Sequence, residues 1–170
     1  MEKKYNQPQN LTDEQRLDRR LSGVLPVIDI MGYPFIVDWR LRELRLQSDT
    51  SIRLDLKSMP MSSDGDKYLC YYHPPTYSEF VADKNIRQLP KDVVLLEIPY
   101  ELILDPVAVA RQYGLADTEL LDRFPIRQEI KATAVPLEQS YLAELVKNNQ
   151  ARSKKSVLRK PHKTRKGKGL

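Results

Sequence analysis

Residues 24–45, VLPVIDIMGYPFIVDWRLRELR, constrain the fold most, because they carry the pattern of a β-hairpin. Residues 27–30 are β-branched and apolar apart from Asp29, as expected of a strand. Gly32 and Pro34 then mark a tight turn, since glycine adopts positive φ freely and proline cannot donate a ladder hydrogen bond. After the turn, apolar and charged residues alternate, which predicts a second strand with one buried face. The residues expected on that face are Phe35, Val37, Trp39 and Leu41.

A hairpin is marginal by itself in water, so its apolar face needs other elements packed on it. The hydrophobic periodicity of the rest of the chain predicts short strands and short helices. Thr12 begins a capping box, and Asp105-Pro106 is a typical helix start. Strands are expected at residues 51–58, 67–73, 93–98 and 128–135. Helices are expected at residues 13–21, 105–113, 118–123 and 138–147.

These patterns predict a single α+β domain over residues 12–150. Its core would be one mostly antiparallel sheet of five or six strands, with a few short helices packed on it. A flexible N-terminus, residues 1–11, would precede the domain. A disordered basic C-terminal tail, residues 151–170, would follow it. Residues 59–66 and 74–92 are expected to be loops, and the second is long enough to suggest a functional role.

The charge is divided unevenly along the chain. The net charge of the 170 residues is +5, but residues 152–170 hold nine basic residues and no acidic one. The other 151 residues therefore hold 19 basic and 23 acidic side chains, a net charge of −4. A mildly acidic body with a strongly basic end is the clearest functional signal in the sequence.

Cations of the tail can bind phosphates and release counterions, an affinity that falls steeply with salt. We therefore predict non-specific nucleic-acid binding by this segment, without a preference for RNA or DNA. Contact with an acidic protein partner and a purely solubilising role remain alternatives. The predicted nucleic-acid-binding residues are Arg152, Lys154, Lys155, Arg159, Lys160, Lys163, Arg165, Lys166 and Lys168.

The sequence gives few candidates for catalysis, and we predict no catalytic residue, metal ligand or cofactor. It lacks the nucleotide-binding, zinc-protease and hydrolase motifs. Cys70 and His73 are three residues apart, which on a strand places them on opposite faces. Asp29 and Asp38 could face each other across the hairpin as an acid–base pair, but both also fit solvent-facing positions. An enzyme with a site near the hairpin turn and the 59–66 and 74–92 loops remains an alternative.

Two further sets of side chains have both a functional and a structural interpretation. Four tyrosines could form a base-stacking platform, although tyrosine is also common in strands. Three arginines of the first helix could form a basic stripe, although a solvated helix face is the simpler interpretation. The two sets are Tyr68, Tyr71, Tyr72 and Tyr77, and Arg16, Arg19 and Arg20.

The N-terminal residues contain no apolar core of a secretory signal, and no apolar run reaches the 18–20 residues, roughly, of a membrane span. We therefore expect a cytoplasmic protein without a membrane partner. The single cysteine, Cys70, allows no internal disulfide.

Several short strings resemble those of a group of short bacterial proteins of unassigned function. They are LSGVLP at 21–26, DIMG at 29–32, FIVD at 35–38, DP at 105–106 and YGL at 113–115. The resemblance covers roughly residues 21–150 and implies a shared fold. Some of these proteins are associated with mobile elements, which adds weight to nucleic-acid binding but implies no activity.

Together these observations predict a non-enzymatic accessory or interaction protein, whose basic tail contacts nucleic acid and whose body binds a protein partner. A protein-interaction module without any nucleic-acid role is the main alternative.

Overall fold

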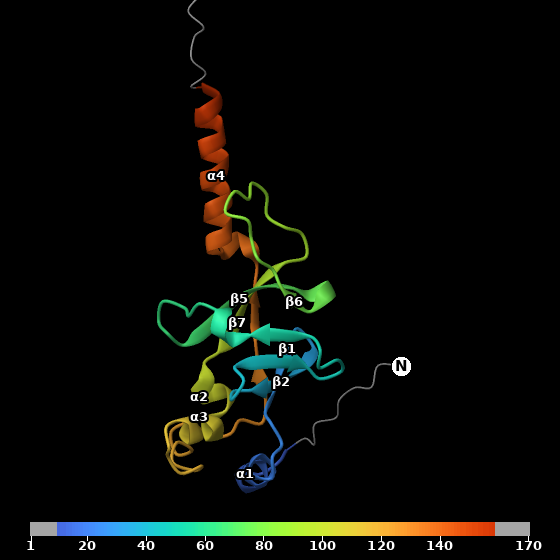
Figure 1. Ribbon diagram of the computed structural model, residues 1–170, viewed down its shortest axis with the longest axis vertical. Helices are drawn as coiled ribbons and strands as arrows, with labels where there is room; N and C mark the ends of the chain where they lie inside the picture. The colour runs from blue at the N-terminus through green and yellow to red at the C-terminus, as the bar shows by residue number, and fades with distance from the viewer. Residues whose placement is uncertain (1–9, 159–170) are drawn as a thin grey trace, which may run out of the picture.

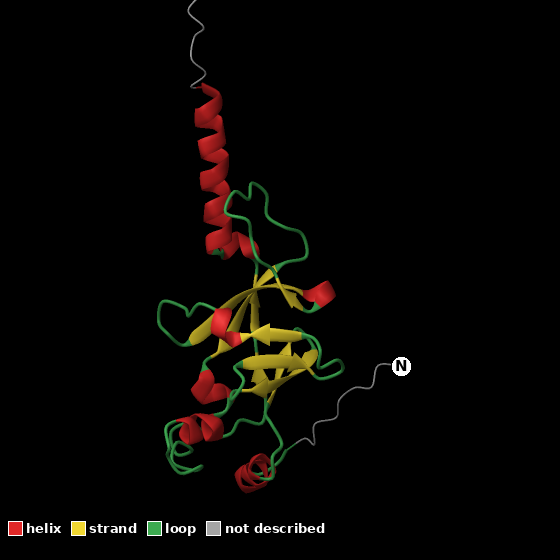
Figure 2. Ribbon diagram, viewed as in Figure 1, coloured by secondary structure: helices red, strands yellow, loops and turns green. Residues whose placement is uncertain are grey.

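The computed structural model describes residues 10–158, which form two β-sheets with helices at both ends (Figures 1 and 2). Three α-helices lie below the sheets in this view: α1 (Asp13–Leu21), α2 (Glu101–Leu104) and α3 (Pro106–Gln112). A fourth, α4 (Tyr141–Leu158), projects above them. The α+β class is as predicted.

The first sheet has five strands in the order β4-β3-β2-β1-β8. The predicted hairpin is confirmed, because β1 and β2 pair antiparallel around the turn, with Ile30 opposite Tyr33. Strand β3 was not predicted, and β1 pairs parallel with β8. The strands are β1 (Val27–Ile30), β2 (Tyr33–Asp38), β3 (Glu43–Leu46), β4 (Arg53–Asp55) and β8 (Ile130–Lys131).

The second sheet has four antiparallel strands in the order β6-β5-β7-β9. These strands are β5 (Lys67–His73), β6 (Ser78–Glu79), β7 (Val94–Pro99) and β9 (Thr133–Val135).

The prediction of a single sheet is wrong, because one stretch near the C-terminus takes part in two sheets. Ile130 pairs with Ile28 of β1, whereas Ala134 pairs with Leu96 of β7. Between them, the Ala132 N–H donates to the Asp29 carbonyl at 2.9 Å. The predicted strand 128–135 is thus two short strands, β8 and β9, that join the two sheets.

Two helices form where their caps predict them. Helix α1 (Asp13–Leu21) begins at Thr12 with both hydrogen bonds of the capping box. Helix α3 (Pro106–Gln112) begins at Asp105, whose carboxylate accepts from the Ala108 N–H at 3.1 Å.

Other helical segments differ from the prediction. Residues 118–123 form turns instead of a helix. The strand predicted at 51–58 ends at Asp55, whose side chain caps a short 3-10 helix. The helices not predicted are α2 (Glu101–Leu104) and the 3-10 helices η1 (Leu56–Ser58), η2 (Pro74–Thr76) and η3 (Leu137–Gln139).

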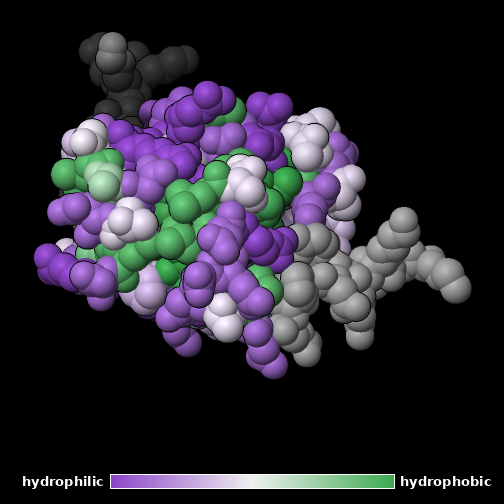
Figure 3. All heavy atoms as spheres, turned by 90° about the horizontal axis from the view of Figure 1, so that it is seen from below, coloured by the Kyte–Doolittle hydropathy of each residue, from purple (hydrophilic) through white to green (hydrophobic). Residues whose placement is uncertain are grey.

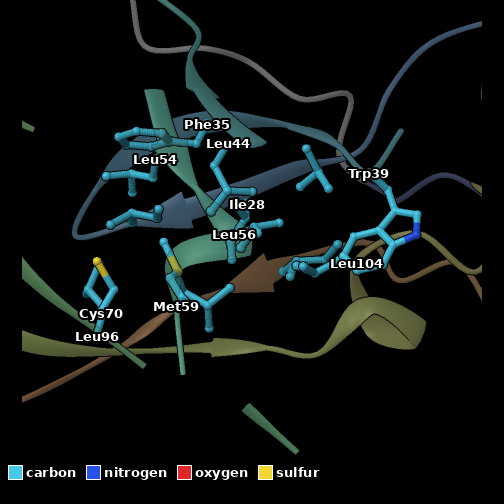
Figure 4. Close-up of a cluster of buried hydrophobic side chains, with 14 of the residues drawn as sticks. Ile28, Phe35, Trp39, Leu44, Leu54, Leu56, Met59, Cys70, Leu96 and Leu104 are labelled. Atoms are coloured by element: carbon cyan, nitrogen blue, oxygen red, sulfur yellow. The ribbon is translucent and has the colours of Figure 1, made fainter. Parts of the chain in front are cut away.

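The main hydrophobic core lies between the two sheets, where strands of both contribute side chains (Figure 4). Phe35, Val37 and Trp39 are buried as predicted, and the Trp39 indole N–H donates to Gln112 of α3 at 2.9 Å. Leu41 is 44% exposed instead, because β2 ends at Asp38 and the chain turns before Arg42, whose φ is 56°. The alternation therefore predicted the buried face correctly only as far as Trp39.

Cys70 is a buried free thiol in this core. Burial, together with the nearby Glu79 carboxylate, raises the pKa of the Cys70 thiol to about 12. Because the thiolate is the reactive form, we expect labelling by a thiol reagent at pH 8 to be at least about 100-fold slower in the native protein than in the chain unfolded in guanidinium. Rapid stoichiometric labelling of the native protein would contradict this burial.

Candidate nucleic-acid interface

Helix α4 (Tyr141–Leu158) packs on the body mainly through its N-terminal half. Leu142 and Val146 are buried, and Leu142 joins a small apolar cluster with Val93 and Leu137. The Tyr71 hydroxyl of β5 accepts from the Leu142 N–H at 3.2 Å. Beyond these contacts the helix extends away from both sheets (Figure 1).

Two amide side chains of α4 hold the loop that follows β6. Asn149 is buried, and its amide donates to the carbonyls of Lys84 at 2.9 Å and Ile86 at 2.8 Å. Gln150 donates to the Arg87 carbonyl at 2.7 Å. These three bonds place the exposed residues Lys84 and Arg87 directly beside α4.

The outer part of α4 and this loop together form a basic surface. No acidic residue follows Glu144 along the chain, and Asp83 is the single acid in residues 80–91. We call this surface the basic end. Its described members, all exposed, are Lys84, Arg87, Lys147, Arg152, Lys154 and Lys155.

The structure covers a third of the predicted nucleic-acid-binding residues. Arg152, Lys154 and Lys155 lie on the last turns of α4 with exposed side chains. The others lie outside the described residues: Arg159, Lys160, Lys163, Arg165, Lys166 and Lys168.

Residues 151–158, predicted as part of a disordered tail, are helical. The helix passes its predicted end at Lys147 because no glycine or proline interrupts residues 141–158, and most of them favour helices. Charge composition alone predicted that this segment binds nucleic acid. Its helical form could have been inferred only from the absence of glycine and proline. No sequence pattern could have placed Lys84 and Arg87 beside α4, because their position depends on hydrogen bonds from Asn149 and Gln150.

The two aspartates of the hairpin are not brought together. Asp29 lies opposite Pro34, and its carboxylate accepts from the Gly32 N–H at 2.9 Å within the turn. Asp38 is buried and forms an ion pair with Arg45 at 2.8 Å. Burial raises the pKa of Asp38, but the hydrogen bonds from Arg45 and the Leu41 N–H outweigh it and leave the pKa below its ordinary value. Both carboxylates therefore have structural partners, and the interpretation of Asp38 as solvent-facing is wrong.

Cys70 and His73 are likewise not brought together as a nucleophile and base. Cys70 is buried in the core, whereas His73 is at the end of β5 with its Nδ1 2.7 Å from the Thr76 hydroxyl.

The four tyrosines do not form an open stacking surface. Tyr72 is buried, and the Tyr68 hydroxyl donates to Glu101 at 2.8 Å. The Tyr71 hydroxyl accepts from α4, as described above. Tyr77 packs edge-to-face against Tyr33, with ring centroids 4.9 Å apart. These rings thus make internal contacts that a base-stacking role would have to break.

Arg20 is the residue whose role the sequence missed most clearly. Its side chain is buried, not solvated, and donates three hydrogen bonds to the Asp105 carboxylate. The Nε atom donates to Oδ1 at 3.1 Å and to Oδ2 at 3.2 Å, and Nη2 donates to Oδ2 at 2.9 Å. Asp105 is only 1% exposed. This ion pair joins α1 to the start of α3, which are 85 residues apart in sequence.

Residues 10–158 offer neither a metal site nor a membrane-spanning helix. These residues contain no group of three or more His, Cys, Asp or Glu side chains arranged to hold a metal ion. None of their helices is both long and apolar enough to span a membrane.

A scan of protein-family models and searches of curated proteins and of solved structures found no match to this chain. The resemblance to short bacterial proteins therefore stays a prediction.

Proposed function

We propose that this protein is a non-enzymatic accessory protein of the cytoplasm, whose basic end and C-terminal segment contact nucleic acid non-specifically and whose acidic body binds a protein partner. The observation that carries the proposal is that helix α4 extends away from the body and bears exposed cations, with no acidic residue after Glu144 in the sequence.

The arrangement suits a phosphate backbone better than a sequence-specific site. Lysine and arginine side chains on two adjacent segments can neutralise phosphates without a fixed geometry, and each contact releases counterions. Base-specific contacts need side chains that the protein holds in a fixed position against base edges. Lys154 and Lys155 are exposed, and no hydrogen bond or ion pair within residues 10–158 fixes their side chains. The cations that follow Leu158 in the sequence add to the same charge.

The test compares the full chain with a truncation at residue 151, on single- and double-stranded oligonucleotides. We expect the full chain to bind both, and six phosphate contacts would weaken its binding to duplex about 1000-fold between 50 and 200 mM salt. The truncation should lose binding but retain its fold, because it keeps Asn149, Gln150 and every buried contact of α4. Fluorescence anisotropy measures binding, and circular dichroism checks the fold.

Two charge variants test whether binding depends on where the cations lie or only on the net charge of the protein. The variant R152E/K154E/K155E should weaken binding at least about tenfold more than R40E/K57E/K131E, which changes the net charge equally at exposed sites outside the basic end. Equal losses in the two variants, or no binding by the full chain at 50 mM salt, would overturn the proposal.

A further inference from the structure

We propose that a groove between α1 and the α2–α3 junction binds an acidic, apolar peptide segment of a partner protein. The inference rests on the part of the proposed function that gives the body a protein partner. It does not depend on nucleic-acid binding.

The groove has an apolar surface at the lower end of the molecule. Figure 3 shows this end, where apolar side chains form a band bordered by hydrophilic ones. The hollow measures about 90 Å³, well below the roughly 300–1,000 Å³ of a small-molecule site, so it fits individual side chains of a peptide. Its apolar lining includes Leu11, Val24, Leu25, Pro26, Ile103 and Ile126.

The charge of the groove is opposite to that of the body. Among the described residues that line it, four are arginines and one, Asp105, is acidic. The body as a whole carries a net charge of −4, so this concentration of arginines is a local reversal. We call the site the arginine-rimmed groove. Its arginines are Arg16, Arg19, Arg20 and Arg127.

The four arginines differ in what they can offer a partner. Arg20 is committed to Asp105, as described above. Arg16 is fixed by Asp13, by the Ile126 carbonyl at 2.9 Å and by Gln128 at 3.0 Å. Arg19 and Arg127 form no ion pair within the described part of the chain, and Arg127 is exposed. They are therefore the residues that we assign to carboxylates of the partner.

Two other occupants fit this surface less well. A nucleic acid could contact the arginines, but it would leave the apolar floor of the groove uncovered. Val24 in that floor is 44% exposed, so an apolar partner is needed to bury it. In a symmetric dimer a second copy would bring its own arginine-rimmed groove, which opposes like charges across the interface. A segment that alternates carboxylate and large apolar side chains satisfies both the rim and the floor.

The test is a selection of displayed random peptides of about 12 residues on the full chain. We expect enriched peptides to combine Asp or Glu with Leu, Ile or Phe. Binding of the enriched peptides, resynthesised with a fluorescent label, should weaken at least tenfold in R19E/R127E. It should also weaken in V24D, which places a carboxylate at the exposed apolar floor. The variant R40E/K57E, with the same change of net charge outside the groove, should bind within about twofold of the unchanged protein.

Acidic peptides could also bind to the basic end, and the variant R152E/K154E/K155E distinguishes this from binding in the groove. If the groove is the site, this variant should bind the peptides within about twofold of the unchanged protein. The inference is overturned if no peptide is enriched, if enriched peptides lack acidic residues, or if this variant abolishes binding while R19E/R127E does not. A dimer that R19E/R127E dissociates would also overturn it, by assigning the groove to a second copy. Nucleic-acid binding, measured on the same variants, fails or succeeds independently of these results.

Discussion

Replacing Arg20 with methionine is expected to destabilise the folded protein by about 3–5 kcal/mol. The substitution keeps an extended apolar side chain but leaves the Asp105 carboxylate, 1% exposed, without its cation. An unpaired buried charge is far more costly than the modest net gain from the intact pair. Urea unfolding at pH 7, followed by the fluorescence of the single tryptophan Trp39, measures the change in the free energy of unfolding.

Two controls identify the ion pair as the cause. Arg19→Met, on the same helix but without an ion pair in the described structure, should change stability by less than about 0.5 kcal/mol. The double variant R20M/D105N should recover most of the loss, because the neutral amide oxygen can still accept from the Ala108 N–H. A loss below about 1 kcal/mol in R20M would mean that water reaches Asp105.

Phe35→Ala should lower the free energy of unfolding by a similar amount, about 3–5 kcal/mol. Phe35 is fully buried and lies opposite Ile28 on one side and Leu46 on the other, so three strands meet at its ring. Removing the ring leaves a cavity that these strands cannot fill without breaking their pairing. The same urea titration measures the effect.

The matched control for Phe35 is Leu41, which simple alternation places on the same face. Because Leu41 is 44% exposed, Leu41→Ala should cost less than about 1 kcal/mol. Equal losses at the two positions would mean that the strand continues through residues 39–42, contrary to the structure.

The parts of the fold that the sequence predicted have local causes. Thr12 and Asp105 cap their helices with their own side chains, and Gly32 with Asp29 makes the hairpin turn. The division into two sheets has no local cause, since Ile28 pairs with a residue about a hundred positions later. Strand β3 was missed because its four residues are too few for periodicity to distinguish from a turn.

In the candidate sites too, the sequence predicted only the features that have a local cause. Composition predicted the cations at Arg152, Lys154 and Lys155, because charge density needs no tertiary structure. The place of Lys84 beside α4 depends on hydrogen bonds from Asn149, 65 residues away. Arg20 has the spacing of a solvated helix residue, and only the position of α3 makes it a buried one.

The stretch from Ile130 to Val135 has a consequence for folding during synthesis. It covers the open edges of β1 and β7, so both edges stay unpaired on the nascent chain until this stretch leaves the ribosome. Contacts over such a sequence separation also slow folding. Neither sheet can therefore close before residue 135 has left the ribosome, and fragments that end before residue 130 should aggregate through these two edges.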